Sequence, residues 1–466
     1  MSTKNTVTLD NLVSLCKRRG FVYPSSEIYG GLANCYDYGP LGVELLRNIK
    51  NLWWKYFITD RDDMLGLDSQ ILLHPKTWIA SGHVDSFNDP LVEDKVTHRR
   101  YRVDHLIEEW LENQEDLKLK EIIVEDMTID EMGDFISEHN IKSPEGNNIS
   151  QPLSFNLLFE SSIGSVEESK SKVYFRGETA QGIYTNFKQI VNSNRVKLPF
   201  GVGQIGKSFR NEVTTGQFIF RTLEFEQAEI EYFIDPNKTD PKQKLEEWKD
   251  ILWKFITEEL GIDENNLRWR RHTDKERSFY SADTYDLDYR YPFGWKELWG
   301  LAYRTDYDLK THMKHSNQSL EYLDPMTGEK IVPHVIEPAG GINRLLLMVL
   351  HDAYYEEEDK KRLVLKLKPC LAPNKVAVFP LLKNKPEIKK LATKVYKQLK
   401  KKFATTWDDR GNIGKRYLYQ DEIGTPYCIT IDYQSLEDNT VTIRYRDTTE
   451  QKRVEISNIE KELKIC

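Results

Sequence analysis

Hydrophobic side chains recur at helical spacing in three separate segments of the chain. Residues 41–57 place seven apolar side chains on one stripe, and residues 242–260 and 388–399 each carry a stripe of four. Strand-like runs dominate residues 173–233 and resume over 267–309. The pattern predicts three amphipathic helices and two strand-rich regions.

Shorter signals predict several further elements. Residues 64–73 are expected to form one strand, and Gly340-Gly341 a turn that opens a buried helix. Residues 376–379 have the pattern of a short buried strand, and residues 441–446 that of a two-faced strand.

The pattern also predicts how the chain divides into domains. Between residues 95 and 172, charged helical segments of weak periodicity alternate with loop signals. We interpret this stretch as an insertion within a larger domain formed by residues 1–94 and 173–368. Pro369 and Pro373 mark a linker, and residues 373–466 are expected to form a final α/β unit.

Size and composition limit the class of protein. With 466 residues the chain is too long for one compact core, so two or three domains are expected. No apolar run approaches the roughly 20 residues of a membrane span, and no secretory signal is evident at the N-terminus. We expect a cytoplasmic protein with no membrane contact.

The cysteines point to the same compartment. They are scattered, with no C-x-x-C pair: Cys16, Cys35, Cys370, Cys428 and Cys466. This usage is typical of a reducing cytoplasm, and we expect no structural zinc.

Charge is unevenly distributed along the chain. The net charge is −8, yet residues 373–466 carry 19 Lys and Arg against 13 Asp and Glu, a net of +6. In this unit, strand 441–446 places Arg444 and Arg446 on one face, where either is a candidate for a phosphate contact. A basic terminal unit suits a polyanion partner, but so small a surplus is equally typical of a solvated surface.

Two apolar runs bring together the groups that carry chemistry. Phe209-Arg210-Asn211-Glu212 ends the first run, and residues 220–231 alternate Phe, Glu and Gln in the second. Two antiparallel strands would place these side chains on one face, because successive strand residues point to opposite sides. That face offers a cation for phosphate, a ring for a base and carboxylates for an amine, as the activation of an amino acid with ATP requires.

These motifs resemble those of class II aminoacyl-tRNA synthetases, and most closely the homodimeric type of glycyl-tRNA synthetase. The matching segments, in the family's order, are residues 36–42 (motif 1), 175–182, 204–212 and 225–229 (motif 2), 334–344 (motif 3), and 421–426 with 436–441 (anticodon-binding domain). The resemblance implies an α+β catalytic domain built on an antiparallel sheet flanked by helices, with a helical or mixed insertion and a C-terminal α/β anticodon-binding domain. It also implies a homodimer with the motif 1 helix at its interface.

The reaction implied by the resemblance has two steps. Glycine and ATP form glycyl-adenylate with release of pyrophosphate, and tRNA(Gly) then accepts the glycyl group. Mg²⁺ is expected to accompany ATP. Catalysis of this kind depends on positioning and charge stabilisation more than on covalent chemistry by the protein.

The resemblance assigns the nucleotide side of the site. Arg210, with Glu212, would hold the α-phosphate, and Arg344 would enclose adenine against Phe225, while Glu297 matches the family's ATP and Mg²⁺ position. The full set of expected ATP-binding residues is Arg210, Asn211, Glu212, Phe220, Arg221, Thr222, Phe225, Glu297, Leu298, Gly341 and Arg344. The alternatives are a surface ion pair between Arg210 and Glu212, and a core position for Phe225.

The glycine side is assigned in the same way. The matching positions are Arg102, Glu178, Phe225, Glu226, Gln227, Glu229, Glu337, Ala339 and Gly341. Clustered buried carboxylates without a cation would be costly, so an ammonium ligand accounts for Glu178, Glu229 and Glu337. Their long side chains also fill the space that a larger substrate would need.

The chain departs from the family pattern at three places. Ala339 stands where the family usually has Ser, and Asn343 where it often has an acidic residue. A cysteine pair that some relatives carry near residues 143–146 is absent from this sequence. This absence argues against a metal-stabilised insertion.

Two rival interpretations stay open. The fold could serve another synthetase of this class (seryl, threonyl, prolyl or histidyl), although Glu178 with Glu229 argues against a pocket for a side chain. A synthetase-like accessory subunit without catalysis is the second rival, and the retention of Arg210, Glu297 and Arg344 argues against it.

Overall fold

The computed structural model describes residues 7–114, 119, 122, 124, 127–164, 171–213, 217–273 and 281–465. Cys466 lies outside these residues, as does part of the loop between the two motif-bearing runs. Within the described ranges, no helix is long and apolar enough to cross a membrane.

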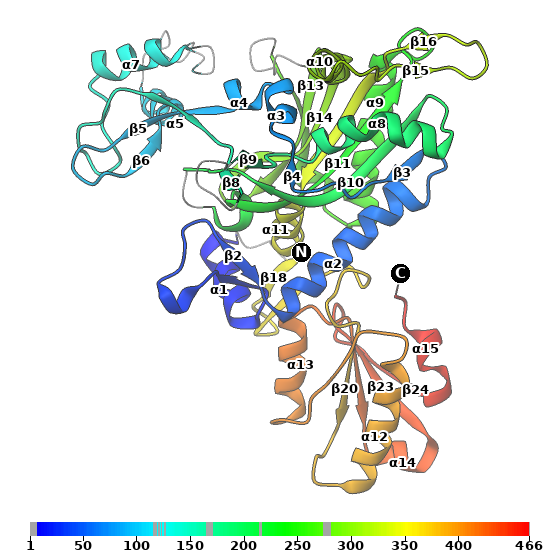
Figure 1. Cartoon of the computed structure of the whole chain (residues 1–466). Helices are drawn as coiled ribbons and strands as arrows, with labels where there is room; N and C mark the ends of the chain where they lie inside the picture. The colour runs from blue at the N-terminus through cyan, green and yellow to red at the C-terminus, as the bar shows by residue number, and fades with distance from the viewer. Residues whose placement is uncertain are drawn as a thin grey trace.

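A seven-stranded sheet forms the centre of the upper part of the molecule (Figure 1). Its strands, in spatial order, are β12 (Leu267–Arg271), β13 (Asp283–Tyr291), β14 (Gly294–Thr305), β17 (His334–Gly341), β11 (Glu224–Ile234), β10 (Phe200–Phe209) and β3 (Met64–Gly66). All neighbouring pairs are antiparallel except β10 with β3, which run parallel. The predicted antiparallel sheet is therefore confirmed, with one parallel edge strand.

The two faces of this sheet differ in chemistry. On β11, Ala228, Ile230 and Tyr232 point into the main hydrophobic core, whereas Glu229 and Glu231 alternate with them on the opposite face. Helices α2 (Pro40–Trp54), α9 (Pro241–Lys254) and α11 (Ile342–Ala353) supply the apolar side chains of that core. One face is thus sealed by helices, and the other presents acidic groups.

The predicted helices over residues 41–57 and 242–260 are confirmed with one refinement. Each is an α-helix that continues as a π-helical turn, at Lys55–Thr59 and at Phe255–Glu259. Their stripes pack against each other, with Phe57 and Phe255 rings 4.8 Å apart.

Three local predictions are wrong. Helix α8 (Ala180–Asn194) interrupts the strands expected over 173–233, because Ile183, Phe187 and Ile190 follow helical spacing. Residues 64–73 form two short strands, β3 and β4 (Leu72–Leu73), in different sheets. Gly340-Gly341 ends strand β17 instead of forming a turn, since Gly340 pairs with both Trp299 and Ala228. The buried helix predicted to follow it is confirmed as α11, which begins at Ile342.

A small sheet and two helices form a separate unit at the upper left of Figure 1. Strands β6 (Arg100–Arg102), β5 (Asn88–Glu93) and β7 (Leu153–Asn156) pack with α5 (Val103–Glu112) and α7 (Ile129–Glu138) around their own hydrophobic core. It is reached through α3 (Pro75–Ala80) and α4 (His83–Ser86). A further sheet joins β4, β9 (Ser171–Phe175) and β8 (Glu160–Ile163).

The C-terminal region is a three-layer α/β unit, at the bottom of Figure 1. Its sheet has the order β21 (Thr405–Trp407), β20 (Val376–Pro380), β22 (Tyr427–Ile431), β23 (Thr440–Tyr445) and β24 (Gln451–Glu455). Helix α12 (Pro386–Leu399) covers one face, and α13 (Ile413–Glu422) contributes to the apolar cluster on the other. The predicted strands and helix of this region are confirmed.

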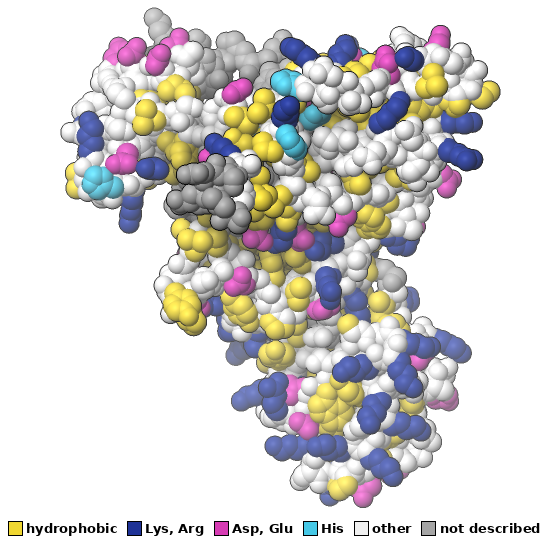
Figure 2. All heavy atoms as spheres, viewed as in Figure 1, with side chains coloured by type: hydrophobic (Ala, Val, Ile, Leu, Met, Phe, Trp, Pro, Cys, Tyr) yellow, Lys and Arg dark blue, Asp and Glu magenta, His cyan; other side chains and the backbone are white. Residues whose placement is uncertain are grey.

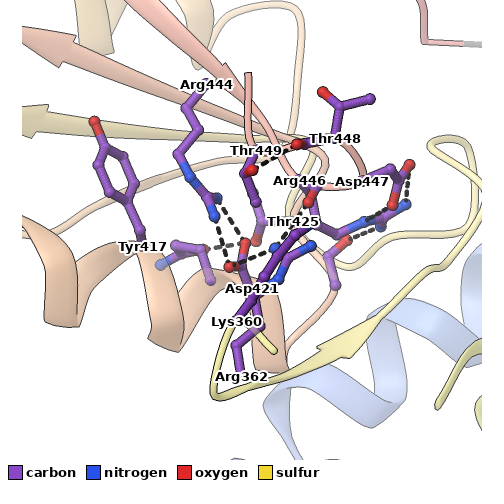
Figure 3. A network of polar contacts seen from close by, with 12 residues as sticks. Lys360, Arg362, Tyr417, Asp421, Thr425, Arg444, Arg446, Asp447, Thr448 and Thr449 are labelled. Carbon is purple, nitrogen blue, oxygen red and sulfur yellow. Dashed lines mark hydrogen bonds and ion pairs between the residues drawn. The ribbon is translucent and has the colours of Figure 1, made fainter. Parts of the chain in front are cut away.

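A buried ionic network joins this unit to the hairpin of β18 (Tyr354–Glu357) and β19 (Arg362–Leu365), as Figure 3 shows. Asp421 of α13 accepts hydrogen bonds from Arg362 at 2.8 Å and from Arg444 at 2.7 and 2.8 Å. Arg446 pairs with Asp447 and donates to the Gly424 and Leu367 carbonyls. Both Arg444 and Arg446 are buried, at 6% and 2% exposure, so the expected phosphate contact is wrong for either.

Candidate active site

The acidic face of the seven-stranded sheet is hollowed into a cavity of about 340 Å³. Most residues expected at the site line it: Glu178, Arg210, Glu212, Phe220, Arg221, Thr222, Phe225, Gln227, Glu229, Glu297, Glu337, Ala339, Gly341 and Arg344. They come from strands β11, β14 and β17, from the start of helix α11 and from the loops beside the sheet, so the sheet gathers residues that are far apart in the sequence.

Strand register explains the shape of the floor. Gly300, Ala339 and Glu229 lie in one row across β14, β17 and β11, and Ala302 pairs with Glu337 in the next row. Small side chains leave space above β14 and β17. The carboxyl groups of Glu229 and Glu337 therefore close only one end of the cavity.

The closed end holds three glutamates, as expected from the sequence. Glu178 precedes helix α8, Glu229 lies on β11 and Glu337 on β17, and all three are buried. Glu229 accepts hydrogen bonds from Thr179 and, at 3.0 Å, from Gln227, and it bonds to the Glu337 carboxyl. These contacts fix the acids in a compact cluster.

The acids differ in their protonation. Burial, followed by the charges of Glu337 and Glu178, holds the pKa of Glu229 well above its usual range. The pKa of Glu337 is also raised by burial, against the opposing effect of Arg304. Burial opposes ionisation of Glu178 too, but His83 and then Arg304 outweigh it and lower the Glu178 pKa. Glu178 is thus the ionised member of the three, and an arriving cation would favour ionisation of the others.

A buried arginine at the back of the cluster was not expected from the sequence. Arg304 Nη1 lies 2.7 Å from Glu337 Oε2, and its Nε lies 2.8 Å from Asp308 Oδ2. Arg304 and Asp308 belong to a strand end and the helix α10 (Tyr307–Ser316) that follows it. Only spatial proximity to Glu337 distinguishes this arginine from others in the chain.

A fourth acid, Glu231, lies behind the cluster and was also not expected. Its Oε2 accepts a hydrogen bond from the Tyr184 hydroxyl at 2.5 Å, and burial followed by the Glu337 charge holds its pKa well above the usual range. Its Oε1 is buried without a hydrogen-bond partner among the described residues. Glu231 is therefore a neutral, structural member of the group.

The open end of the cavity carries the predicted cations and rings. The Arg210 guanidinium lies between the rings of Phe225 and Phe87, at 5.3 and 5.1 Å, and its Nε donates to the Gly177 carbonyl at 3.0 Å. Glu212 faces Arg221 at 3.9 Å. This geometry does not support the alternative of a simple Arg210–Glu212 surface pair.

Arg344 occupies the far wall of the open end. It stacks over the Phe220 ring at 4.3 Å and forms an ion pair with Glu297 at 3.1 Å. Asp286, which was not expected at the site, lines the cavity with Glu297. Carboxylates are hard oxygen donors of the kind that Mg²⁺ prefers. Here each is ion-paired, Glu297 with Arg344 and Asp286 with Arg270 and His272, and would exchange that partner to hold an ion.

Four expected residues do not line the cavity: Arg102, Asn211, Glu226 and Leu298. The expectation for Glu226 is wrong, because its side chain points to the opposite face and pairs with Lys50 of α2 at 2.8 Å. Leu298 is fully buried in the main core, so its side chain is also excluded from the site. Arg102 forms ion pairs with Asp89 and Asp104 at the edge of the insertion.

The two departures from the family pattern have different settings. Ala339 lies in the floor of the cavity, where it adds no polar contact. Asn343 bridges two segments: its Oδ1 accepts from the Glu226 amide at 2.8 Å, and its Nδ2 donates to the Tyr38 hydroxyl. The Asn343 amide thus accepts one hydrogen bond and donates another. An ionised carboxylate at this position could only accept, because it has no donor.

Comparison with known proteins agrees with this architecture. Residues 159–353 match the model of the tRNA synthetase class II core domain (G, H, P, S and T), and residues 375–465 match that of the anticodon binding domain. Prolyl-tRNA synthetase from Cryptosporidium parvum, solved with L-proline and AMP, is similar in fold, with a TM-score of 0.62 and 15% identity over 99% of this chain and 76% of that one.

Sequence relatives are much closer. A glycine–tRNA ligase of Caldanaerobacter subterraneus is 50% identical over 461 residues, which cover 98% of each chain. One from Clostridium acetobutylicum is 49% identical over 465 residues, 99% of each chain. On this identity along nearly its whole length, the chain belongs to the glycine–tRNA ligase family.

Proposed function

We propose that the cavity binds glycine at its acidic end and ATP at its cationic end, and joins them as glycyl-adenylate. The chain is a ligase that forms aminoacyl-tRNA, in this family from glycine, ATP and tRNA(Gly). The observation that carries the site assignment is the convergence of Glu178, Glu229 and Glu337 beside Arg210 and Arg344 in one cavity.

The proposed reaction needs no covalent bond between the substrates and the protein. The glycine carboxylate attacks the α-phosphate, the bond to pyrophosphate breaks, and negative charge builds on the phosphate oxygens. Arg210 lies where it can stabilise that charge, with a planar guanidinium already oriented by two rings and the Gly177 carbonyl. Mg²⁺ held by Glu297 and Asp286 would supply further positive charge toward the outer phosphates.

The acidic end accounts for the choice of glycine. An ammonium group there would meet one ionised carboxylate and two that can ionise on its arrival. Because three glutamate side chains fill this end, a substrate side chain has no room. Exclusion by shape rejects larger amino acids more strongly than the roughly 1–3 kcal/mol that one methylene changes in binding.

The partner tRNA fits the basic C-terminal unit. Figure 2 shows Lys and Arg side chains over much of the visible face of that unit. Exposed lysines gather on and around α12: Lys383, Lys385, Lys389, Lys390, Lys394, Lys397, Lys400, Lys401 and Lys402. This lysine face replaces the buried Arg444 and Arg446 as the proposed phosphate contact.

We propose the domain division 1–94 with 173–368, 95–172 and 373–466, since separate hydrophobic cores support the insertion and the C-terminal unit. Strand β5, at residues 88–93, already pairs with strands of the insertion. We expect no zinc in that insertion. Its 143–147 loop is tied instead by the buried Asp94, which accepts hydrogen bonds from Ser143 and Asn147.

A homodimer in the cytoplasm is proposed as the working form. The segment between strands β1 (Val22–Pro24) and β2 (Tyr36–Tyr38) exposes large apolar residues, with Ile28 and Tyr29 at 87% and Leu32 at 62%. Such a patch is typical of a protein interface, and it adjoins motif 1. Sedimentation of the full chain tests this, and a monomer at micromolar concentration would contradict it.

Amino-acid-dependent exchange of pyrophosphate into ATP tests the proposed reaction. Exchange is expected with glycine and not with alanine, serine or proline. Exchange driven by serine or proline would favour another specificity of the class, and no exchange with any amino acid would favour a non-catalytic role.

A further inference from the structure

His83 lies against the glycine end of the cavity from outside the sheet. It opens helix α4, and its Nε2 lies 3.3 Å from Glu178 Oε2, while its Nδ1 lies 2.8 Å from the Ser81 hydroxyl. Gln181 holds the other oxygen of Glu178 at 2.9 Å. Both oxygens of the one ionised carboxylate are therefore fixed by protein groups.

The imidazole is enclosed by apolar side chains. Its ring packs edge-on to Trp78 at 5.2 Å and beside Phe87 at 5.1 Å, and only 7% of the residue is exposed. In such a setting a contact between histidine and a carboxylate is poorly screened by water. Glu178 is thus the main polar partner of the His83 Nε2 atom.

The surrounding charges come from every element packed here. Arg304 and Glu337 approach from the sheet, and Asp308 and His312 from α10, where His312 lies 2.8 Å from the Gln181 side chain. Burial would hold Glu178 protonated, and His83 contributes the largest effect in the opposite direction, ahead of Arg304. Removing the imidazole would therefore raise the pKa of Glu178.

We propose that His83 is a positioning residue for glycine: its Nε2 holds one oxygen of Glu178 and so orients that carboxylate toward the substrate ammonium. The proposal rests on the proposed function, since it takes the acidic end as the ammonium site. It extends the site to a residue that no motif comparison indicated.

The position of His83 in the chain connects it to both ends of the cavity. The class II core match covers residues 159–353, so His83 lies outside the shared core. It lies on the segment that leads into the insertion, four residues before Phe87, which packs on Arg210. The same short segment thus contacts the glycine end and the phosphate end of one cavity.

The competing explanation is that His83 only fills the apolar cluster around Trp78. Two substitutions separate the possibilities. H83L keeps apolar volume but removes the ring nitrogens, whereas H83Q keeps an amide donor near the Nε2 position without an imidazole. V84A is the matched control, because Val84 packs in the same cluster and has no contact with Glu178 among the described residues.

Steady-state exchange on the full chain gives the readout. For H83L we expect the glycine KM to rise at least about tenfold, as for loss of a charged hydrogen bond, with the ATP KM within about twofold. H83Q should recover part of that loss. V84A should lower the melting temperature without separating the two KM values.

The pH profile provides a second readout that a filling role would not change. Because His83 lowers the Glu178 pKa, the wild-type glycine KM should vary little as the pH falls toward about 6. In H83Q, Glu178 takes up a proton at higher pH, so the glycine KM should rise toward acid pH. ATP KM should show no such change.

Three results would overturn the proposal. They are a folded H83L with wild-type glycine KM, equal changes in both KM values as in V84A, or, if H83L does not fold, an H83Q variant with the wild-type pH profile. The wild-type protein must first exchange with glycine; failure there would remove the proposed function, not the role of His83 alone.

Discussion

Two clusters of buried charge in this molecule follow opposite designs. In the network that joins β19 to the C-terminal unit, the buried Arg362, Arg444 and Arg446 are matched by Asp421, by the mostly buried Glu357 and, at the surface, by Asp447. Figure 3 shows Asp421 and Asp447 with these arginines. At the glycine end of the cavity, acids outnumber cations. Glu178, Glu229, Glu231, Glu337 and Asp308 surround Arg304 and His83.

This difference in charge balance agrees with the separate roles proposed for the two clusters. Breaking a buried pair leaves an uncompensated charge, so a matched network holds its parts in one arrangement. An unmatched acidic cluster must keep some groups protonated, as the raised pKa values of Glu229 and Glu231 show, until a cation arrives. A buried deficit of positive charge is therefore what the proposed ammonium site requires, while balanced charge is what a structural joint requires.

The largest expected effect is a loss of stability when the ionic network around Asp421 is broken. D421A leaves Arg362 and Arg444 buried without their carboxylate, and should lower the free energy of unfolding by about 3–5 kcal/mol. Thermal and urea unfolding measure this. Because the glycine pocket is remote from Asp421, exchange at low temperature should change little; a large loss of exchange with unchanged stability would contradict the division of roles.

In the pocket, R210A should lower the rate of adenylate formation and leave the stability of the fold unchanged. Loss of a cation that stabilises transition-state charge costs about 100- to 1000-fold in rate, so exchange should nearly vanish while the melting temperature stays close to wild type. R210K is the matched control, because lysine keeps the positive charge but lacks the planar, multi-donor guanidinium group. Near wild-type exchange in R210A would exclude the proposed role.

E178Q tests the ionised member of the acidic cluster. Glutamine preserves shape but removes the charge, so the glycine KM should rise about tenfold or more, as for loss of a charged hydrogen bond. Stability should hold or increase slightly, since the cluster has excess acid. A drop in stability like that of D421A would mean that this cluster, too, is a structural network.

Lysines of the C-terminal surface should have a smaller, salt-dependent effect. Replacing Lys390, Lys394 and Lys397 together by Ala should weaken tRNA charging several-fold and flatten its salt dependence, by roughly 0.7–0.9 in log–log slope per lost phosphate contact. Exchange without tRNA should be unaffected. Unchanged charging would place the RNA contact on another surface.

The smallest effect is expected from E231Q. Glu231 is already held neutral, so an amide of the same shape should change the glycine KM by less than about twofold. Comparison of E231Q with E178Q separates an acid that must be ionised for glycine binding, Glu178, from one that remains protonated, Glu231. Equal effects of the two would remove that distinction.

Much of the site was predictable from local pattern and motif. The alternation of residues 225–231 brings Phe225, Gln227 and Glu229 to one face, as the structure confirms. The same period excludes Glu226 from that face, and its inclusion was wrong for that reason. Roles in binding remain predictions for the experiments above.

Other groups could not be found from the sequence. Arg304, Asp308 and Asp286 follow no motif, and His83 is an ordinary histidine at the start of a short helix. Their importance comes from Glu337, Glu297 and Glu178, which lie between 11 and 95 positions away in the chain. Likewise, Arg444 and Arg446 have the pattern of exposed strand residues until the β18–β19 hairpin covers them.

The sequence by itself determined most of the main helices and strands, though not helix α8, and it determined the family and the reaction, because these depend on the order of residues along the chain. Only the tertiary structure decided which carboxylates are charged, which arginines are buried and which face of the C-terminal unit remains basic. The physical reason is that ionisation depends on burial and on distances of a few ångströms between groups that the chain keeps far apart until it folds.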